Sequence, residues 1–255
     1  MDLRLKDRVY IVTGGSSGIG RTIVEAVLAE GASVATCARS SERLRLLRQG
    51  EHSDHLFVAT VDVRDRAAMV TFVDDTAKRF GRLDGIVANA GAGMSGRIFD
   101  AAEEDWIEQI SMKIQGVTNL VNPAIAHLQR SDAGRIVIMN GITAARPEPT
   151  MAVVSAARAA VANLARTLSL ELAPYSIGVN VINPGAIATE RQVVRYRESG
   201  SDLSYDAWCR EEAVRRNIAF GRYGLPTEIA PFVALCLSPL ASYLTGATID
   251  VHGGA

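Results

Sequence analysis

The sequence predicts an α/β protein built on a doubly wound parallel sheet of about seven strands, with helices on both faces. An apolar run over residues 9–12 leads directly into a glycine-rich turn, and apolar residues at helical spacing follow this turn from Gly18. The alternation of an apolar strand with a helical segment then repeats along the chain, as expected for a parallel sheet wound by crossover helices.

Each further element follows from its periodicity and its flanking turn residues. Apolar runs predict strands over residues 33–38, 56–61, 85–88, 135–139, 177–182 and 248–251. Helical spacing predicts helices over residues 67–80, 106–129, 151–173 and 227–237, the last with Thr227 as its N-cap. No internal repeat or linker interrupts the chain, so a single domain over residues 1–255 is expected.

Length and composition restrict the classes of function. The 255 residues, 48% hydrophobic and 22% charged, fit one domain with a substantial core. A net charge of −1 gives no electrostatic reason to expect nucleic acid or a membrane surface as a partner. No apolar run is long enough for a membrane span and residues 1–8 lack a signal-peptide pattern, so a cytoplasmic location is expected. Cys37, Cys209 and Cys236 lack metal-ligand spacing, so reduced thiols and no metal site are expected, with Cys37 buried in a strand.

The glycine-rich turn between the first strand and the first helix favours phosphate binding. A helix N-terminus offers unpaired N–H groups and a positive dipole end to an anion such as a pyrophosphate. Glycine lets the backbone approach the phosphate closely. Ordinary strand-to-helix turns also use glycine, but the flanking elements favour a dinucleotide site. The residues expected to contact the cofactor here are Gly14, Ser16, Ser17, Gly18, Ile19 and Gly20.

The ends of the next strands indicate which dinucleotide binds. A carboxylate after the second strand would bond the ribose hydroxyls of NAD and repel a 2′-phosphate. The chain has Arg39 there, which could grip a phosphate or simply be solvated at a helix start. We therefore predict NADP(H) over NAD(H). Asp62 and Val63 follow the third strand and could meet the adenine. Asn89, Ala90 and Gly91 follow the fourth, where the asparagine could border the ligand, stitch neighbouring strands together, or do both.

Several ordered motifs resemble those of one family. Thr13-Gly14-x-x-x-Gly18-x-Gly20, Ala88-Asn89-Ala90-Gly91, Asn180 with Pro184-Gly185, and the glycine-rich C-terminus from Tyr243 occur in order. They are similar to the cofactor turn, NNAG segment, post-strand turn and C-terminus of short-chain dehydrogenases/reductases, over essentially the full chain. The resemblance implies a Rossmann fold, a nicotinamide cofactor also held by Pro184 and Gly185, and a small-molecule substrate. It also implies a homodimer or homotetramer, and a mobile substrate lid at residues 189–222. The arginines of this insert could meet a carboxylate or phosphate of the substrate, or simply belong to a solvated pair of amphipathic helices.

The resemblance further implies an active-site quartet of Asn, Ser, Tyr and Lys, and all four positions have changed. Counting without gaps from Pro184 places Arg158 at the Lys position and Val154 at the Tyr position. The Ser position falls on Gly141 and the Asn position on Lys113. Valine has no proton to give, and glycine has no hydroxyl to support an oxyanion.

Three residues could supply part of the missing chemistry. If Lys113 points inward beside Arg158, burial and like charge would lower its pKa and make it a candidate acid or base. It could instead fill the Asn space or reach solvent. Arg158 could bind ribose hydroxyls or only preserve the geometry of the cofactor site, and Asn140 could donate to a carbonyl oxygen. Ser155 is expected to face elsewhere, because one helical step turns it by about 100°.

These observations leave three hypotheses. The first is an NADP(H)-dependent oxidoreductase with an atypical active site, passing hydride between the nicotinamide and a carbonyl or alcohol, or an activated C=C bond. The proton would come from Lys113, the substrate or water. The second is a catalytically inactive NADP(H)-binding protein that acts through a partner or as a scaffold. The third is a redox-neutral enzyme on the same fold. Dehalogenase relatives have arginine at the Lys position but give up the glycine turn that this chain keeps.

Overall fold

The computed structural model describes residues 1–49 and 53–255, and their strands form one parallel sheet in the order β3-β2-β1-β4-β5-β6-β7. The strands are β1 (Val9–Thr13), β2 (Ser33–Ala38), β3 (Leu56–Thr60), β4 (Gly85–Ala88), β5 (Arg135–Met139), β6 (Gly178–Pro184) and β7 (Thr248–Val251). All neighbouring pairs are parallel. The winding direction reverses between β1 and β4, which places a ligand crevice at the carboxyl ends of these strands. The predicted doubly wound α/β fold is confirmed.

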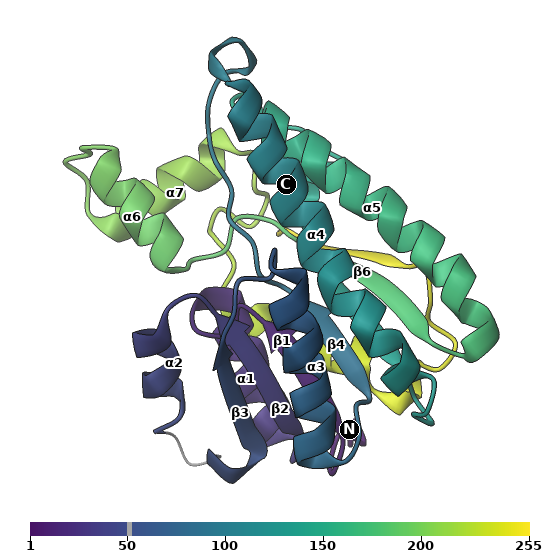
Figure 1. Cartoon of the computed structure of the whole chain (residues 1–255). Coiled ribbons are helices and arrows are strands. Elements are labelled where there is room, and N and C mark those ends of the chain that lie inside the picture. Colours follow the sequence, from purple (N-terminus) through teal and green to yellow (C-terminus); the bar gives the residue numbers. More distant parts are fainter. Residues whose placement is uncertain (50–52) are drawn as a thin grey trace.

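Helices pack on both faces of the sheet (Figure 1). α3 (Arg66–Phe80), α4 (Glu103–Leu128) and α5 (Ala152–Leu172) cover one face, while α1 (Gly18–Ala29) and α8 (Ala230–Leu237) cover the other. Successive strand residues alternate between the two cores. Ile11 packs beneath α3 and α4, whereas its neighbours Tyr10 and Val12 pack beneath α1 and α8. Within the described part of the chain, every helix is too short or too polar to cross a membrane.

Two further helices stand away from the sheet. α6 (Glu190–Glu198) and α7 (Tyr205–Arg215) lie beyond the carboxyl end of β6 (Figure 1). They share a small core of their own, in which Trp208 packs against Tyr196 and Tyr223 at ring-centroid distances of 5.7 and 6.3 Å. The insert expected over residues 189–222 therefore contains a helix pair.

The structure differs from the sequence predictions at the starts of two predicted helices: α4 begins at Glu103, three residues early, and α8 begins late. Thr227 is not an N-cap: Pro226–Glu228 form a 3₁₀ turn, and α8 begins at Ala230. The Glu228 carboxylate closes this turn by accepting a hydrogen bond from the Leu225 N–H at 2.7 Å. Pro231, in the first turn of α8, marks the true start, because proline is pre-organised for that position.

The structure also contains a short helix that the periodicity did not predict. α2 (Ser41–Leu47) follows β2 directly, and the Ser40 hydroxyl caps it by accepting a hydrogen bond from the Arg43 N–H. The helix spans only 7 residues and buries Leu44 alone, so the sequence holds too few apolar repeats to show it.

Candidate cofactor and active site

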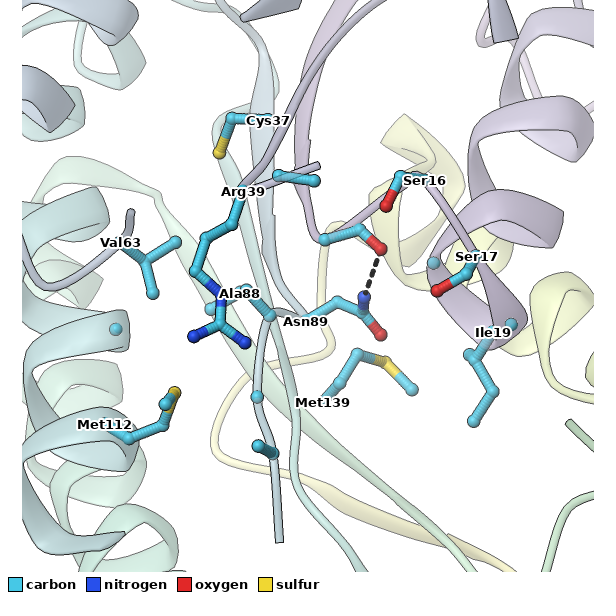
Figure 2. A pocket seen from close by; sticks show the side chains of 18 of the residues that line it. Ser16, Ser17, Ile19, Cys37, Arg39, Val63, Ala88, Asn89, Met112 and Met139 are labelled. Atoms are coloured by element: carbon cyan, nitrogen blue, oxygen red, sulfur yellow. Dashed lines mark hydrogen bonds between the residues drawn. The ribbon is translucent and has the colours of Figure 1, made fainter. Parts of the chain in front are cut away.

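A cavity of about 610 Å³ lies at the carboxyl ends of the strands, around the point where the winding reverses. It is lined by the turn between β1 and α1, the ends of β2 to β6, residues of α4 and α5, and the start of α6. Figure 2 labels side chains from the turn, from the ends of several strands and from α4. The sequence-predicted residues that line it are Gly14, Ser16, Ser17, Gly18, Ile19, Gly20, Arg39, Asp62, Val63, Asn89, Ala90, Gly91, Lys113, Asn140, Arg158 and Pro184. Gly185 lies apart from these residues and packs on His252, whose Cα would be 2.8 Å from a Cβ built at the glycine.

Two glycines of the turn hold the backbone closer than a side chain would allow. Gly14 has a φ of 73°, and a Cβ there would lie 2.9 Å from the Cα of Ala90. A Cβ at Gly20 would lie 2.4 Å from Asn89 Nδ2. The turn is therefore shaped by backbone, which leaves room for a phosphate to approach it.

Asn89 connects this turn to the end of β4. Its Nδ2 donates to the Thr13 carbonyl at 2.9 Å and, more weakly, to the Gly14 carbonyl at 3.5 Å. A dashed line in Figure 2 marks a hydrogen bond of this amide. Thr13 Oγ1 in turn accepts hydrogen bonds from the N–H groups of Asn89 and Ala90, both at 3.0 Å. Of the roles the sequence left open, Asn89 has both: it stitches β1 to β4 and it borders the cavity.

The start of α1 can receive an anion. The helix begins at Gly18, and within the described chain its N-cap, Ser17, makes no side-chain cap hydrogen bond and no acidic residue lies in its first turn. Ser16, Ser17 and Ile19 all face the cavity (Figure 2). The first N–H groups and the positive end of the helix dipole are thus directed at the cavity.

The ends of β2 and β3 present a guanidinium and a neutralised carboxylate. Arg39 reaches into the cavity between Val63 and Asn89 in the view of Figure 2. The Asp62 carboxylate is paired with Arg64, with Oδ2 and Nη2 2.7 Å apart, and this hydrogen bond lowers the pKa of Asp62. Cys37 is buried, as predicted, and burial raises the pKa of its thiol to about 12.

Arg158 occupies the space in front of Gly141. A Cβ built at Gly141 would lie 2.5 Å from Arg158 Nη1 and 2.6 Å from its Cζ. The same Nη1 donates to Thr143 Oγ1 at 2.7 Å. Val154, one helical turn earlier on α5, is fully buried. The guanidinium therefore lies where the family resemblance would place a serine side chain.

Asn140 ties the end of β5 to α5. Its Nδ2 donates to the Arg158 carbonyl at 3.1 Å, while its Oδ1 is buried and lacks a partner among the described residues. Ser155, which was expected to face away from the site, is buried and does not line the cavity. Asn140 thus helps to fix the backbone that carries Arg158.

Lys113 points inward beside the segment that follows β4. Its Nζ donates to the Ala92 carbonyl at 2.8 Å and would lie 3.0 Å from a Cβ at Gly91. Burial is the main cause that lowers the pKa of Lys113 to about 7, and the charges of Arg158 and Arg191 lower it further. The half-buried lysine therefore lines the cavity, with its ammonium held at the backbone of Ala92.

Sequence reasoning did not single out Arg191 from the other arginines of the insert. It lies in the first turn of α6, lines the cavity, and its Nη2 donates to the Gly93 carbonyl at 2.9 Å. Burial and the charge of Arg195 lower the pKa of Arg191. The pKa of Arg158 is lowered to about 10, mainly by burial and further by the positive charge of Arg191. The only feature of the sequence that could have singled out Arg191 is its position near the start of the insert, shortly after Pro184 and Gly185.

This fold, with a glycine-shaped phosphate turn at the reversal of the sheet, defines a dinucleotide-binding α/β protein. A family model described as short chain dehydrogenase matches residues 8–199. The chain therefore belongs to the short-chain dehydrogenase/reductase family, whose members are oxidoreductases that bind a nicotinamide cofactor.

Known relatives match over nearly the whole chain. An acetoacetyl-CoA reductase of Synechocystis sp. is 32% identical over 254 residues, which are 99% of this chain and 98% of that protein. A structure of a short chain oxidoreductase from Pseudomonas aeruginosa PAO1 containing an atypical catalytic center is 36% identical, with a TM-score of 0.93 over 98% of this chain and 97% of that one. Its NADPH-bound structure matches with a TM-score of 0.91, at the same identity, over 97% and 96% of the two chains. L-sorbose reductase from Gluconobacter frateurii, complexed with NADPH and L-sorbose, is 28% identical with a TM-score of 0.93, over 100% and 98%.

Within residues 1–49 and 53–255, no group of three or more His, Cys, Asp or Glu side chains is arranged to hold a metal ion. The charged groups of the cavity are instead mainly cations, and these are the groups available for chemistry.

Proposed function

We propose that the chain is an NADP(H)-dependent oxidoreductase that passes hydride between the nicotinamide and a carbonyl or alcohol, with Lys113 moving the proton. The observation that carries this proposal is a half-buried lysine, with a pKa of about 7, in the same cavity as the phosphate-binding turn. A group whose pKa lies near the working pH is suited to general acid–base catalysis.

The cavity fits a nicotinamide dinucleotide. Gly14 and Gly20 leave space that a Cβ would fill, and the start of α1 is open to the pyrophosphate. When bound, the dinucleotide supplies or accepts the hydride. Asn89 keeps the turn in shape, and Pro184 lines the cavity at the end of β6.

We propose NADP(H) rather than NAD(H) because of the charges at the end of β2. Arg39, Ser40 and Arg43 line this part of the cavity, and two of the three are guanidinium groups that suit a 2′-phosphate. The nearby Asp62 carboxylate is paired with Arg64, which reduces its repulsion of such a phosphate. The NADPH-bound structure of the Pseudomonas aeruginosa relative supports this choice.

In the direction of reduction, the Lys113 ammonium gives its proton to the oxygen that forms on the substrate. In the opposite direction the neutral amine accepts that proton, since its lowered pKa makes both forms accessible near neutral pH. Arg158 holds the substrate or the nicotinamide ribose, because its pKa of about 10 keeps it charged. The helix pair α6–α7 serves as the lid, and Arg191 joins it to the segment after β4.

A second candidate is a non-catalytic NADP(H)-binding protein. Val154 and Gly141 favour it, because neither can transfer a proton or bind an oxyanion through its side chain. In either case we expect a homodimer or homotetramer; the exposed alanines of α5, Ala156, Ala159 and Ala160, would allow close packing.

Two measurements test the proposed function. Calorimetry should show NADPH binding more tightly than NADH. Stopped-flow fluorescence should then show oxidation of enzyme-bound NADPH by at least one member of a panel of ketones, aldehydes and oxo acids. Tight NADPH binding with no oxidation by any member would refute the oxidoreductase and favour the scaffold. No heat with either dinucleotide would refute both.

A further inference from the structure

The substrate end of the cavity carries three cationic side chains from three different helices. Lys113 comes from α4, Arg158 from α5 and Arg191 from α6, and all three line the same cavity. None of them forms an ion pair within the described residues, whose ion pairs all involve other side chains. Lys113 and Arg158 are half-buried, where an unpaired charge is costly, whereas Arg191 is exposed and adds a third positive charge to the same cavity.

The two acidic side chains that bear on these cations have other neighbours. Glu148 raises the pKa of Arg158 through its negative charge, but its carboxylate forms an ion pair with Arg216, with Oε2 and Nη1 2.8 Å apart. Glu190 lines the cavity, but its Oε2 lies on the side of the phosphate turn, 3.7 Å from a Cβ built at Gly18. Within the described residues, none of the three cations therefore has an ion-pair partner, and Glu148 offsets the charge of Arg158 only in part.

The contacts that the three cations do make are to neutral oxygens. Lys113 and Arg191 donate to the carbonyls of Ala92 and Gly93, and Arg158 donates to the Thr143 hydroxyl. These contacts use a fraction of the three donors of an ammonium and the five of a guanidinium. Arg158 Nε is buried and has no partner among the residues described. The cations are thus held in place by backbone and hydroxyl groups while keeping donors for a ligand.

The cofactor does not account for this charge. In the proposed function its phosphates are bound by the turn at residues 14–20 and by Arg39, which line the same cavity. The nicotinamide end of the reduced cofactor is neutral, and its oxidised form adds a further positive charge. A neutral ketone would leave all three cations unpaired as well.

We propose that the substrate is an oxo acid or hydroxy acid whose carboxylate is bound by Arg158 and Arg191, next to the carbonyl or alcohol carbon that exchanges hydride. This inference rests on the proposed function. A guanidinium matches a carboxylate with two parallel hydrogen bonds, which a neutral oxygen cannot use fully. In reduction, hydride from NADPH forms the new C–H bond, the carbonyl oxygen takes a proton from Lys113, and NADP⁺ and the hydroxy acid are released; solvent then reprotonates the lysine.

The carboxylate is tested with matched pairs of substrates that differ only in charge. The probes are acetoacetate with methyl acetoacetate, 2-oxobutyrate with its methyl ester, and levulinate with methyl levulinate. The kcat/KM of the preferred acid should exceed that of its ester by about 10- to 100-fold, the size of one charge-assisted contact. Malonate, which cannot be reduced here, should bind the NADPH-loaded protein in calorimetry and compete with that acid.

The variant Arg191→Gln should bring the acid-to-ester ratio close to one and weaken malonate binding by a similar factor. Arg197→Gln is the matched control, because this exposed arginine lies on the same helix but does not line the cavity. It should leave the ratio and malonate affinity unchanged. An equal effect of both substitutions would indicate a general effect of net charge and overturn the proposal.

The failures of the two proposals are distinguishable. Turnover of esters at least as fast as acids, with NADPH, would overturn the carboxylate site and leave the oxidoreductase intact. Tighter binding of a phosphorylated ketone than of any carboxylate would also overturn the carboxylate assignment. Malonate binding that Arg191→Gln abolishes, without oxidation of NADPH by any probe, would support the anion site and refute hydride transfer.

Discussion

Replacing Lys113 with methionine tests the proposed proton donor through activity and stability together. Methionine keeps most of the length and apolar surface of the side chain but has no proton to give. If Lys113 is the acid, reduction by NADPH should slow by about 10²- to 10⁴-fold. In the wild-type protein the rate of reduction should level off below pH 7 and fall as the pH rises above it, because the ammonium with its pKa of about 7 is the active form. The variant should lose this dependence.

The same substitution should stabilise the fold at neutral pH. Because the pKa of Lys113 is lowered from 10.5 to about 7 in the native state, holding the lysine charged there disfavours folding. This penalty is full below pH 7, shrinks as the pH rises from 7 to 10.5, and is absent above 10.5. Each pKa unit corresponds to about 1.4 kcal/mol, so Lys113→Met should gain up to about 4 kcal/mol at pH 7.

Urea denaturation at pH 7.0, 8.5 and 10 would measure the stability, and stopped-flow fluorescence between pH 6 and 9 the rate. Lys78→Met is the control, since this exposed lysine of α3 lies outside the cavity and should change stability by less than about 0.5 kcal/mol. Equal stability of wild type and Lys113→Met at pH 7 and at pH 10 would show that the lysine is not charged and buried as argued. An unchanged rate of reduction would remove it as the proton donor.

Three further predictions concern other parts of the molecule. In calorimetry, Arg39→Ala should lower the affinity for NADPH by about 10- to 100-fold and the affinity for NADH much less. The control Arg45→Ala, at an exposed arginine outside the cavity, should change neither affinity. Equal losses of affinity for both cofactors would contradict a contact between Arg39 and the 2′-phosphate. Asp84→Ala should cost about 3–5 kcal/mol in urea denaturation, because the fully buried carboxylate accepts from Val9 N, Ser131 Oγ and two arginines at the amino end of the sheet. Asp74→Ala, at an exposed pair, should cost less than about 1 kcal/mol. Gly141→Ser should lower the free energy of unfolding by about 1–3 kcal/mol, since its Cβ would lie 2.5 Å from Arg158 Nη1. Adding Arg158→Lys to this variant should restore part of the lost stability. If the effects of the two substitutions on stability are additive, the two residues are not coupled.

The fold was predictable because it depends on local and periodic features. The alternation of strands and helices predicts the parallel sheet, and the glycine-rich turn at Gly14 to Gly20 predicts a phosphate site. Neither prediction needs any knowledge of tertiary contacts. Helix starts were less predictable where another residue took over the cap. Around Thr227 the Glu228 side chain closes a separate 3₁₀ turn, so the Thr227 hydroxyl does not cap α8. A search of the sequence for capping hydroxyls does not detect such a turn.

The charge of the active site was only partly predictable. The inward direction of Lys113 could be proposed as only one of several alternatives, because its place in the sequence does not show that its ammonium meets the Ala92 carbonyl. Arg191 was missed because its position depends on how the helix pair of the insert returns to the segment after β4. Gly185 was grouped with Pro184 by the motif, yet a single residue step turns it toward His252.

The changed positions are physically linked, and this link bears on how the site works. Arg158 fits only because residue 141 has no side chain, since even a Cβ there would overlap the guanidinium. The same guanidinium helps to lower the pKa of Lys113, which the structure places beside Gly91. The absence of a side chain at Gly141 thus makes room for Arg158, and the charge of Arg158 helps to lower the pKa of Lys113 toward 7. A site that had merely lost its catalytic groups would have no reason to keep a half-buried ammonium beside two guanidinium groups, because such a cluster destabilises the fold unless an anion or a proton transfer makes use of it.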